Sequence, residues 1–254
     1  MIEEPYRWVE AIANRREYIE TQLAPGSPIA ALSYRDGILF VTIGQARQKL
    51  FEIYDRIAMG AIGHPGDIER LRMAAIELAS TEGFTRSAAD VSLRRLAFYS
   101  LSPLLKTAFE QVYGAPYLAR MIFAEVGATP PNDLFLRVEY DGAIAAQGPK
   151  QPSFCAISGT ARATEVMEEL LARDHNPEAT LHQAIKVALD AWSVGSMPPA
   201  EEGTREIPSH PALLEHRQER LKNATIEACL LERDAATSIR YRPLQGEELE
   251  TLTA

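Results

Sequence analysis

The sequence lacks several features that would place it in a specialised class of protein. It has only two cysteines among 254 residues, which is too few for a disulfide scaffold and indicates a reducing compartment. No apolar run approaches the roughly 20 residues that cross a bilayer. The N-terminus has no basic segment followed by an apolar one, as a secretory signal would. These absences predict a cytoplasmic protein without a membrane partner.

The sequence also has fewer basic than acidic residues. The chain carries 26 Lys and Arg against 35 Asp and Glu, so its formal net charge is −9. Binding to nucleic-acid phosphates requires a surplus of Lys and Arg, which excludes a general nucleic-acid binder. A hydrophobic content of 46% is ordinary for a folded domain and also argues against a disordered chain.

The common motifs of metal and cofactor chemistry are missing. The five histidines form no H-x₃-H or HExxH pattern, and the cysteines form no CxxC pair. No phosphate-binding glycine loop and no GxSxG nucleophile turn is present. The sequence therefore predicts no metal site and no cofactor. Cys155 and Cys229 lie in apolar segments and are expected to be buried structural thiols.

The hydrophobic periodicity predicts an alternation of strand blocks and helix pairs. Trp8, Ile12, Ile19 and Leu23 recur at helical spacing in a first helix that ends at Ala24-Pro25-Gly26. The expected helices are 5–23, 66–81, 91–112 (with a kink expected near Pro103), 161–172, 177–194 and 211–222. The expected strands are 29–34, 38–43, 49–54, 57–62, 117–126, 134–140, 153–157, 224–232 and 237–242.

The grouping of these elements predicts the fold class. Strands and helices come in blocks, which disfavours the βαβ alternation of a parallel sheet. Two strand blocks and two helix pairs fit an α+β fold, a four-layer αββα sandwich in which helices cover two facing sheets, with an added N-terminal helix. The chain shows no internal repeat, so residues 1–254 are expected to form one domain.

One pair of residues suggests catalytic chemistry. Ser27 stands just before the first strand and Lys49 begins the third, so the sandwich could bring them together. A serine freed at its own amino terminus beside a lysine is the outline of an N-terminal nucleophile hydrolase, in which the α-amine acts as the base. The alternative is that Ser27 is a loop residue and Lys49 faces the surface or a partner.

Several segments carry a resemblance to a known family. They are Gly26-Ser27-Pro28-Ile29-Ala30-Ala31-Leu32, Tyr34-Arg35-Asp36-Gly37, Gln48-Lys49-Leu50-Phe51-Glu52, Gly63-His64-Pro65-Gly66-Asp67, Ile122-Phe123-Ala124-Glu125-Val126 and Leu136-Arg137-Val138-Glu139-Tyr140. The chain resembles subunits of the 20S proteasome over roughly residues 8–195 and 224–252, and most closely the bacterial, actinobacterial-style α type. The resemblance implies the sandwich of N-terminal nucleophile hydrolases.

The resemblance also separates α from β type. A catalytic β subunit exposes an N-terminal threonine, whereas this chain has Ser27 followed by Pro28, and Ile43 replaces the acidic residue that β subunits place at the end of the second strand. The helix at 5–23 is similar to the α-type N-terminal helix, which β subunits lack. The resemblance therefore implies a non-catalytic subunit without catalytic residues of its own.

The implied function is that of a ring subunit. Seven copies would form an α-ring that stacks on β subunits, forms the axial entry pore for unfolded protein substrates and docks an AAA ATPase activator. In the family, the lysine that matches Lys49 pairs with the C-terminal carboxylate of an activator tail. Gly26 and Gly63 match positions that line this pocket, and Glu17 matches an acidic neighbour less closely.

Three regions depart from the family pattern or lie at the ends. Only about four residues precede the first helix, so the gate of the pore is expected to be short or open. Residues 196–222 are longer and more charged than expected and are interpreted as a surface insertion, while 243–254 are expected to form a short helical tail. Two alternatives stay open: a self-compartmentalising hydrolase that uses Ser27 after cleavage at Gly26-Ser27, and a scaffold unrelated to degradation.

Overall fold

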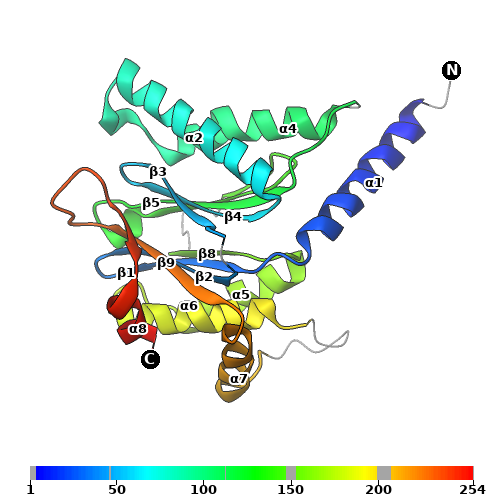
Figure 1. The fold of residues 1–254 in the computed structure, drawn as a ribbon. Helices are drawn as coiled ribbons and strands as arrows, with labels where there is room; N and C mark the ends of the chain where they lie inside the picture. Colours follow the sequence, from blue (N-terminus) through cyan, green and yellow to red (C-terminus); the bar gives the residue numbers. More distant parts are fainter. Residues whose placement is uncertain (1–3, 46, 112, 147–152, 199–206, 254) are drawn as a thin grey trace.

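The computed structural model describes residues 4–45, 47–111, 113–146, 153–198 and 207–253 (Figure 1). The helices are α1 (Glu4–Leu23), α2 (Pro65–Thr85), α3 (Leu93–Leu96), α4 (Ser102–Glu110), α5 (Ala161–Asp174), α6 (Leu181–Ser196), α7 (His210–Leu221) and α8 (Gly246–Thr253). The strands are β1 (Ile29–Tyr34), β2 (Gly37–Gly44), β3 (Leu50–Tyr54), β4 (Ile57–Gly63), β5 (Ala119–Glu125), β6 (Leu134–Val138), β7 (Ile144–Ala146), β8 (Phe154–Ile157), β9 (Thr225–Glu232) and β10 (Tyr241–Leu244).

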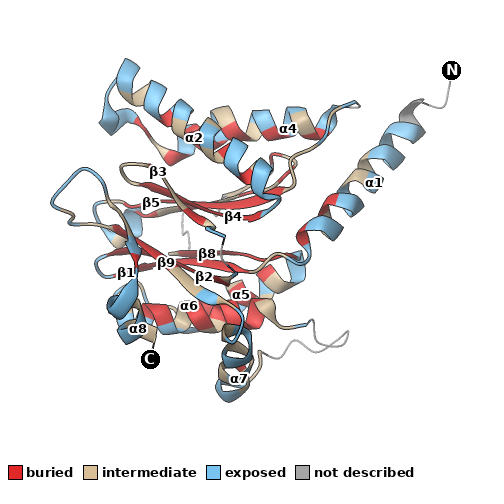
Figure 2. Ribbon diagram, in the orientation of Figure 1, coloured by how far each residue is buried: buried red, intermediate tan, exposed pale blue. Residues whose placement is uncertain are grey.

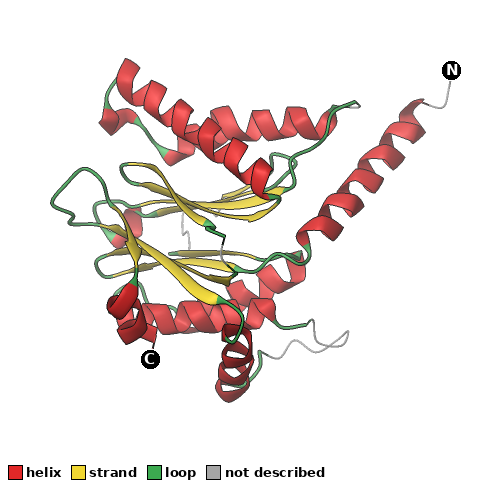
Figure 3. Cartoon of the chain, viewed as in Figure 1, coloured by secondary structure: helices red, strands yellow, loops and turns green. Residues whose placement is uncertain are grey.

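The strands form two antiparallel sheets that face each other (Figure 3). One has the strand order β10-β9-β2-β1-β8 and the other β3-β4-β5-β6-β7. The strands expected at 29–34 and 38–43 are confirmed and form a hairpin, in which Tyr34 pairs with Gly37 across the turn and Ile29 with Thr42 at the far end. The sheets bring distant segments together, since β9 near the C-terminus pairs with β2 along its whole length.

Helices cover the outer faces of both sheets, so the predicted four-layer α+β sandwich is confirmed (Figures 1 and 2). Alternate residues of β1 show the layering: Ala30 and Leu32 pack in the cluster with α5 and α6, whereas Ile29 and Ala31 belong to the cluster between the sheets. Because both faces of each sheet are covered, the strands are continuous apolar runs rather than alternating ones. Both cysteines are buried as predicted, and burial raises the pKa of the Cys155 thiol to about 12.

The helix expected over 91–112 has different bounds and no simple kink. A 3₁₀ turn (Ala88–Asp90) precedes α3, which Ser92 caps, and a π-helical stretch (Ala97–Leu101) joins α3 to α4. In that stretch the N–H of Ser102 bonds to the carbonyl of Ala97, five residues back. The wider turn comes just before Pro103, whose ring excludes the normal pattern, so the helix continues past the proline. Val112 lies outside the described residues.

Other boundaries also differ from those expected. The strand β7 was not predicted. It pairs with β6 through a turn in which Gly142 has φ +82°, and a Cβ there would lie 2.5 Å from the carbonyl oxygen of Ser102. The helix expected at 177 begins at Leu181, because Thr180 and Gln183 form a capping box. The last strand is Tyr241–Leu244 rather than 237–242, and much of 233–240 is a turn.

The terminal regions lie around this sandwich. Helix α1 projects away from the sheets toward the N-terminus, and α7 packs beneath α6 (Figure 1). Of the expected 196–222 insertion, residues 199–206 lie outside the described residues, as do residues 1–3 of the segment before the first helix. The tail expected at 243–254 contains α8. Among the described helices, none is both long enough and apolar enough to span a bilayer.

Candidate functional site

The backbone of Lys49, directly before β3, is held by a carboxylate from the other sheet. Glu227 on β9 accepts hydrogen bonds from the backbone N–H of Lys49 at 3.0 and 3.1 Å and from that of Leu50 at 2.9 Å. The Lys49 side chain runs past Gly44, where a Cβ would lie 3.4 Å from its Nζ. Glu227 therefore sets the direction of the Lys49 backbone without forming an ion pair with its ammonium group.

Burial shapes the electrostatics of this pair. Desolvation lowers the pKa of the Lys49 ammonium, and the nearby charge of Glu227 opposes that shift only in part. Desolvation also raises the pKa of Glu227, against the effect of the backbone hydrogen bonds from Leu50 and Lys49. A half-buried ammonium that loses solvation gains more from an incoming anion than an exposed one does.

Lys49 lies in the wall of a pocket of about 870 Å³. The same pocket is lined by Gly26 and Gly63, so the structure brings three of the four predicted site residues together. Glu17 is exposed on α1 and does not line this pocket, so within one chain it is not a neighbour of Lys49. Its expected role at the pocket stays a prediction.

The two glycines are required by the local backbone. Gly63 has φ +131°, and a Cβ there would lie 2.0 Å from the carbonyl oxygen of Leu118. A Cβ on Gly26 would lie 2.9 Å from the carbonyl oxygen of Leu23 and 3.2 Å from Cδ1 of Ile62. Substituting either residue would therefore shift the backbone even if nothing bound in the pocket.

Ser27 is engaged in hydrogen bonds that do not suit a nucleophile. Its hydroxyl donates to the carbonyl oxygen of Ile43 at 2.5 Å and accepts from the indole Nε1 of Trp192 at 3.1 Å. A nucleophilic hydroxyl instead donates its proton to a base, which removes it during attack. Ser27 thus ties the segment before β1 to β2 and α6.

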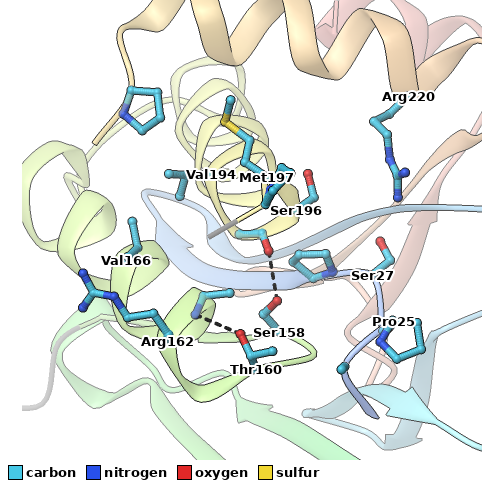
Figure 4. Close-up of a pocket in the computed structure, with 17 residues that line it drawn as sticks. Pro25, Ser27, Ser158, Thr160, Arg162, Val166, Val194, Ser196, Met197 and Arg220 are labelled. Carbon is cyan, nitrogen blue, oxygen red and sulfur yellow. Dashed lines mark hydrogen bonds between the residues drawn. The ribbon is translucent and has the colours of Figure 1, made fainter. Parts of the chain in front are cut away.

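A second, smaller pocket of about 380 Å³ adjoins this segment (Figure 4). Its wall includes the apolar side chains of Pro28, Val166, Val194 and Met197. Four residues line both pockets: Pro25, Gly26, Ser27 and Arg220. The segment from Pro25 to Ser27 therefore lies between this smaller pocket and the pocket that holds Lys49.

Helix α1 is anchored close to both pockets. Arg120 of β5 is buried and bonds to Glu20 of α1 at 3.0 Å, to Glu139 at 2.6 Å and to the carbonyl oxygen of Ser158 at 2.8 Å. The hydroxyl of Tyr140 also donates to Glu20, at 2.9 Å. Through this buried arginine, Glu20 connects the last turns of α1 to β5 and to Glu139, next to the segment that lines both pockets.

Comparison with known proteins decides the family. The family model for proteasome subunits matches residues 25–196, which is more than half of the chain. The chain belongs to the proteasome subunit family. A proteasome subunit alpha of Parafrankia sp. (strain EAN1pec) is 34% identical over 208 residues, which cover 78% of this chain and 79% of that protein.

The similarity to proteasome α subunits extends over nearly the whole chain. The proteasome subunit alpha of Frankia casuarinae is 31% identical over 96% of this chain and 93% of its own length. That of Streptomyces scabiei is 32% identical over 96% of this chain and 88% of its own length. The resemblance to actinobacterial α-type subunits is therefore confirmed. The helices α1 and α7 both lie outside the span of the family model.

Sequence reasoning missed one residue that lines the Lys49 pocket, Arg220, and one that holds the Lys49 backbone beside it, Glu227. Glu227, which holds the Lys49 backbone, is 178 residues away in sequence, and only the pairing of β2 with β9 brings it close. Arg220 was placed in a surface insertion, yet it lines both pockets. No spacing motif marks either residue. In the described part of the chain no cluster of His, Cys, Asp and Glu could hold a metal ion.

Proposed function

We propose that this proteasome α-type chain is a non-catalytic subunit of the α-ring in the 20S core particle. In this proposal seven copies form a ring that stacks on β subunits in the cytoplasm and surrounds the axial pore. Unfolded protein substrates pass through the pore, and an AAA ATPase activator docks on the ring through its C-terminal tails. The relatives that carry the name proteasome subunit alpha support the placement in the core.

The observation that carries the docking role is the pocket around Lys49. Its ammonium group is partly desolvated and has no ion pair or side-chain hydrogen bond with any residue that the structure describes. A chain-terminal carboxylate supplies the missing partner through a charge-assisted hydrogen bond. Gly26 and Gly63 line the pocket without adding a side chain to it.

The state of Ser27 supports a non-catalytic subunit. In the hydrolase alternative, cleavage after Gly26 would release α1 together with the contacts of Glu20 to Arg120. The hydroxyl of Ser27 is already used in bonds to Ile43 and Trp192. Both observations favour an intact α1 and a Ser27 that holds the fold together.

Assembly is tested by co-expressing the chain with the proteasome β subunit of the same genome. We expect a particle much larger than the monomer, peptidase activity that requires the β subunit, and an intact α chain by mass spectrometry. A chain that stays monomeric beside a processed β subunit would contradict the ring. Loss of the residues before Ser27 would instead support the hydrolase alternative.

Docking is tested with a fluorescein-labelled peptide that ends in a free carboxylate. Lys49→Ala should weaken its binding to the assembled chain about tenfold or more, because a hydrogen bond between charged groups is lost (about 1.5–3 kcal/mol). Lys186→Ala on the exposed face of α6 is the matched control and should leave binding unchanged. Equal binding to Lys49→Ala and wild type would contradict the docking role.

A further inference from the structure

Positively charged side chains outnumber carboxylates in the wall of the Lys49 pocket, which indicates an anionic ligand. Three cations, Arg47, Lys49 and Arg220, line the pocket together with two carboxylates, Glu69 and Glu219. None of the three cations forms an ion pair or a side-chain hydrogen bond with a residue that the structure describes. The pocket therefore presents an excess of positive charge, which the Glu227 carboxylate near Lys49 offsets only in part, although the whole chain is acidic.

Both carboxylates in the wall are held by cations that do not line the pocket. Glu69 forms two hydrogen bonds with Arg72, at 2.7 and 2.8 Å, and this contact lowers the pKa of Glu69. Glu219 pairs with Lys222. Because these carboxylates already have partners, they compensate the three cations of the pocket only weakly.

Arg220 is held in position by the packing of α7 on α6. His216 stacks on Trp192 with ring centroids 6.4 Å apart and lies 2.8 Å from the hydroxyl of Ser196. Arg217 forms an ion pair with Asp190 at 3.0 Å. These contacts hold the helix against α6 in the turn just before Arg220, so the packing of the fold sets the position of Arg220.

The side chain of Arg220 extends toward Ser27, at the boundary between the two pockets (Figure 4). It lines the smaller pocket, whose wall includes apolar side chains, as well as the pocket of Lys49. A chain that reaches Lys49 with its terminal carboxylate therefore passes Arg220 before it reaches the apolar side chains of Val166 and Met197. The order of the ligand's groups follows from this arrangement.

We infer that Arg220 forms a second anion subsite beside Lys49, which selects a peptide tail with an acidic side chain between its apolar residue and its terminal carboxylate. This inference rests on the proposed docking role and specifies the chemistry of the docked tail. Arg220 binds the acidic side chain, Lys49 binds the chain terminus, and the 380 Å³ pocket takes the apolar side chain. Arg220 comes from α7, which lies outside the span of the family model.

The test measures the binding of short fluorescein-labelled peptides to the full-length chain in its assembled form. The first peptide ends in Leu-Glu-Ala with a free carboxylate, the second in Leu-Gln-Ala, and the third is the first with a C-terminal amide. On wild type we expect roughly tenfold tighter binding of the Glu peptide than of the Gln peptide. Arg220→Gln should reduce this preference to less than about twofold.

The control variant is Arg35→Gln, an exposed arginine in the turn between β1 and β2 at the other end of the sandwich. It should keep the full preference for Glu over Gln. A preference that survives Arg220→Gln, or that wild type never shows, overturns the inference. Because Arg220 is exposed and makes no side-chain bond among the described residues, we expect its variant to fold, which thermal unfolding verifies.

The amide peptide separates this inference from the proposed function. If the amide binds as tightly as the free acid, the proposed docking of a chain terminus at Lys49 is contradicted. The preference for the Glu peptide over the Gln peptide then still tests the role of Arg220. If the amide binds weakly but the preference ignores Arg220, docking at Lys49 is supported and the second subsite is overturned. Replacing Leu by Ser in the first peptide should weaken binding to wild type, and equal binding would contradict the apolar subsite.

Discussion

The two ends of the sandwich differ in whether their charged side chains are paired. At the Lys49 end, which is the pocket lined by Arg47, Lys49 and Arg220, the cations have no partner among the described residues. At the Asp133 end, where β1 and β2 turn, the Asp133 carboxylate is fully buried. It accepts two bonds from the Arg233 guanidinium, at 2.8 and 2.9 Å, and one from the hydroxyl of Ser33 at 2.6 Å.

This difference separates a binding role from a structural role. The bonded cluster at the Asp133 end joins β1 to the loop before β6 and to the turn after β9. Its charged groups already have partners within the fold, so they stabilise it. The cations at the Lys49 end hold no two elements together, and a pocket gives a ligand access to them. The net charge of an end does not show whether its role is binding or structural. Whether each charged side chain has a partner in the fold does.

The largest expected effect comes from breaking the Asp133 cluster. Asp133→Ala leaves the buried guanidinium of Arg233 without its carboxylate, so the free energy of unfolding should fall by about 3–5 kcal/mol. Urea unfolding of the purified chain measures it. Asp234→Ala, a nearby exposed carboxylate, is the matched control and should change stability by less than about 0.5 kcal/mol. Equal losses in the two variants would contradict a structural role for the cluster.

A smaller loss is expected when only the hydroxyl is removed from this cluster. Ser33→Ala deletes one buried hydrogen bond to the Asp133 carboxylate and should destabilise the chain by about 1.5–3 kcal/mol. The exposed Ser238→Ala serves as its control in the same urea titration. If Ser33→Ala costs as much as Asp133→Ala, the comparison between a hydrogen bond and an ion pair is wrong.

Lowering the pH should reduce the free energy of unfolding through His175 at the Asp133 end, by less than Ser33→Ala does. The imidazole Nε2 lies 2.7 Å from the carbonyl oxygen of Ser33, and burial lowers the pKa of His175. The unfolded chain then binds a proton more readily, so stability is lost as the pH falls below about 6.5. His175→Gln should flatten the stability profile in this range. His216, whose pKa burial also lowers, contributes with the same sign, so the profile of the double variant checks the assignment.

The smallest effect on stability is expected at Lys49. Lys49→Met removes a desolvated charge without a bonded partner, so at neutral pH the change should stay within about 0.5 kcal/mol or be slightly stabilising. Because burial lowers the pKa of Lys49, wild type should gain stability relative to Lys49→Met as the pH rises toward about 10.4. Thermal unfolding at both pH values, with Lys186→Met as control, measures this. A large loss at neutral pH would show that Lys49 supports the fold.

Much of the fold could be predicted because local signals agree with the layers. The block order of strands and helices led to the sandwich, and the strands covered on both faces are continuous apolar runs. The capping box at Thr180 and Gln183 was present in the sequence and would have corrected the start of α6. The π-helical stretch before Pro103 depends on how the chain accommodates the proline, which hydrophobic spacing does not encode.

The candidate site was predictable only in part. The resemblance led to Lys49, Gly26 and Gly63, and the structure places all three in one pocket. Glu227 and Arg220 could not be found in this way, because their positions depend on the pairing of β2 with β9 and on the packing of α7. A residue that acts across a long separation in sequence carries no local signal.

The anchoring of α1 at one end gives the helix the properties of a lever arm. Its last turns are fixed by the buried side chains of Ile19 and Leu23, whereas Trp8 and Val9 are exposed in the part that projects from the sandwich (Figures 1 and 2). Fifteen residues of helix span about 22 Å, so a rotation of about 10° at the base moves Trp8 by roughly 4 Å. The base continues directly into the Pro25 segment, which lines both pockets. A displacement of that segment is therefore magnified at the far end of the helix.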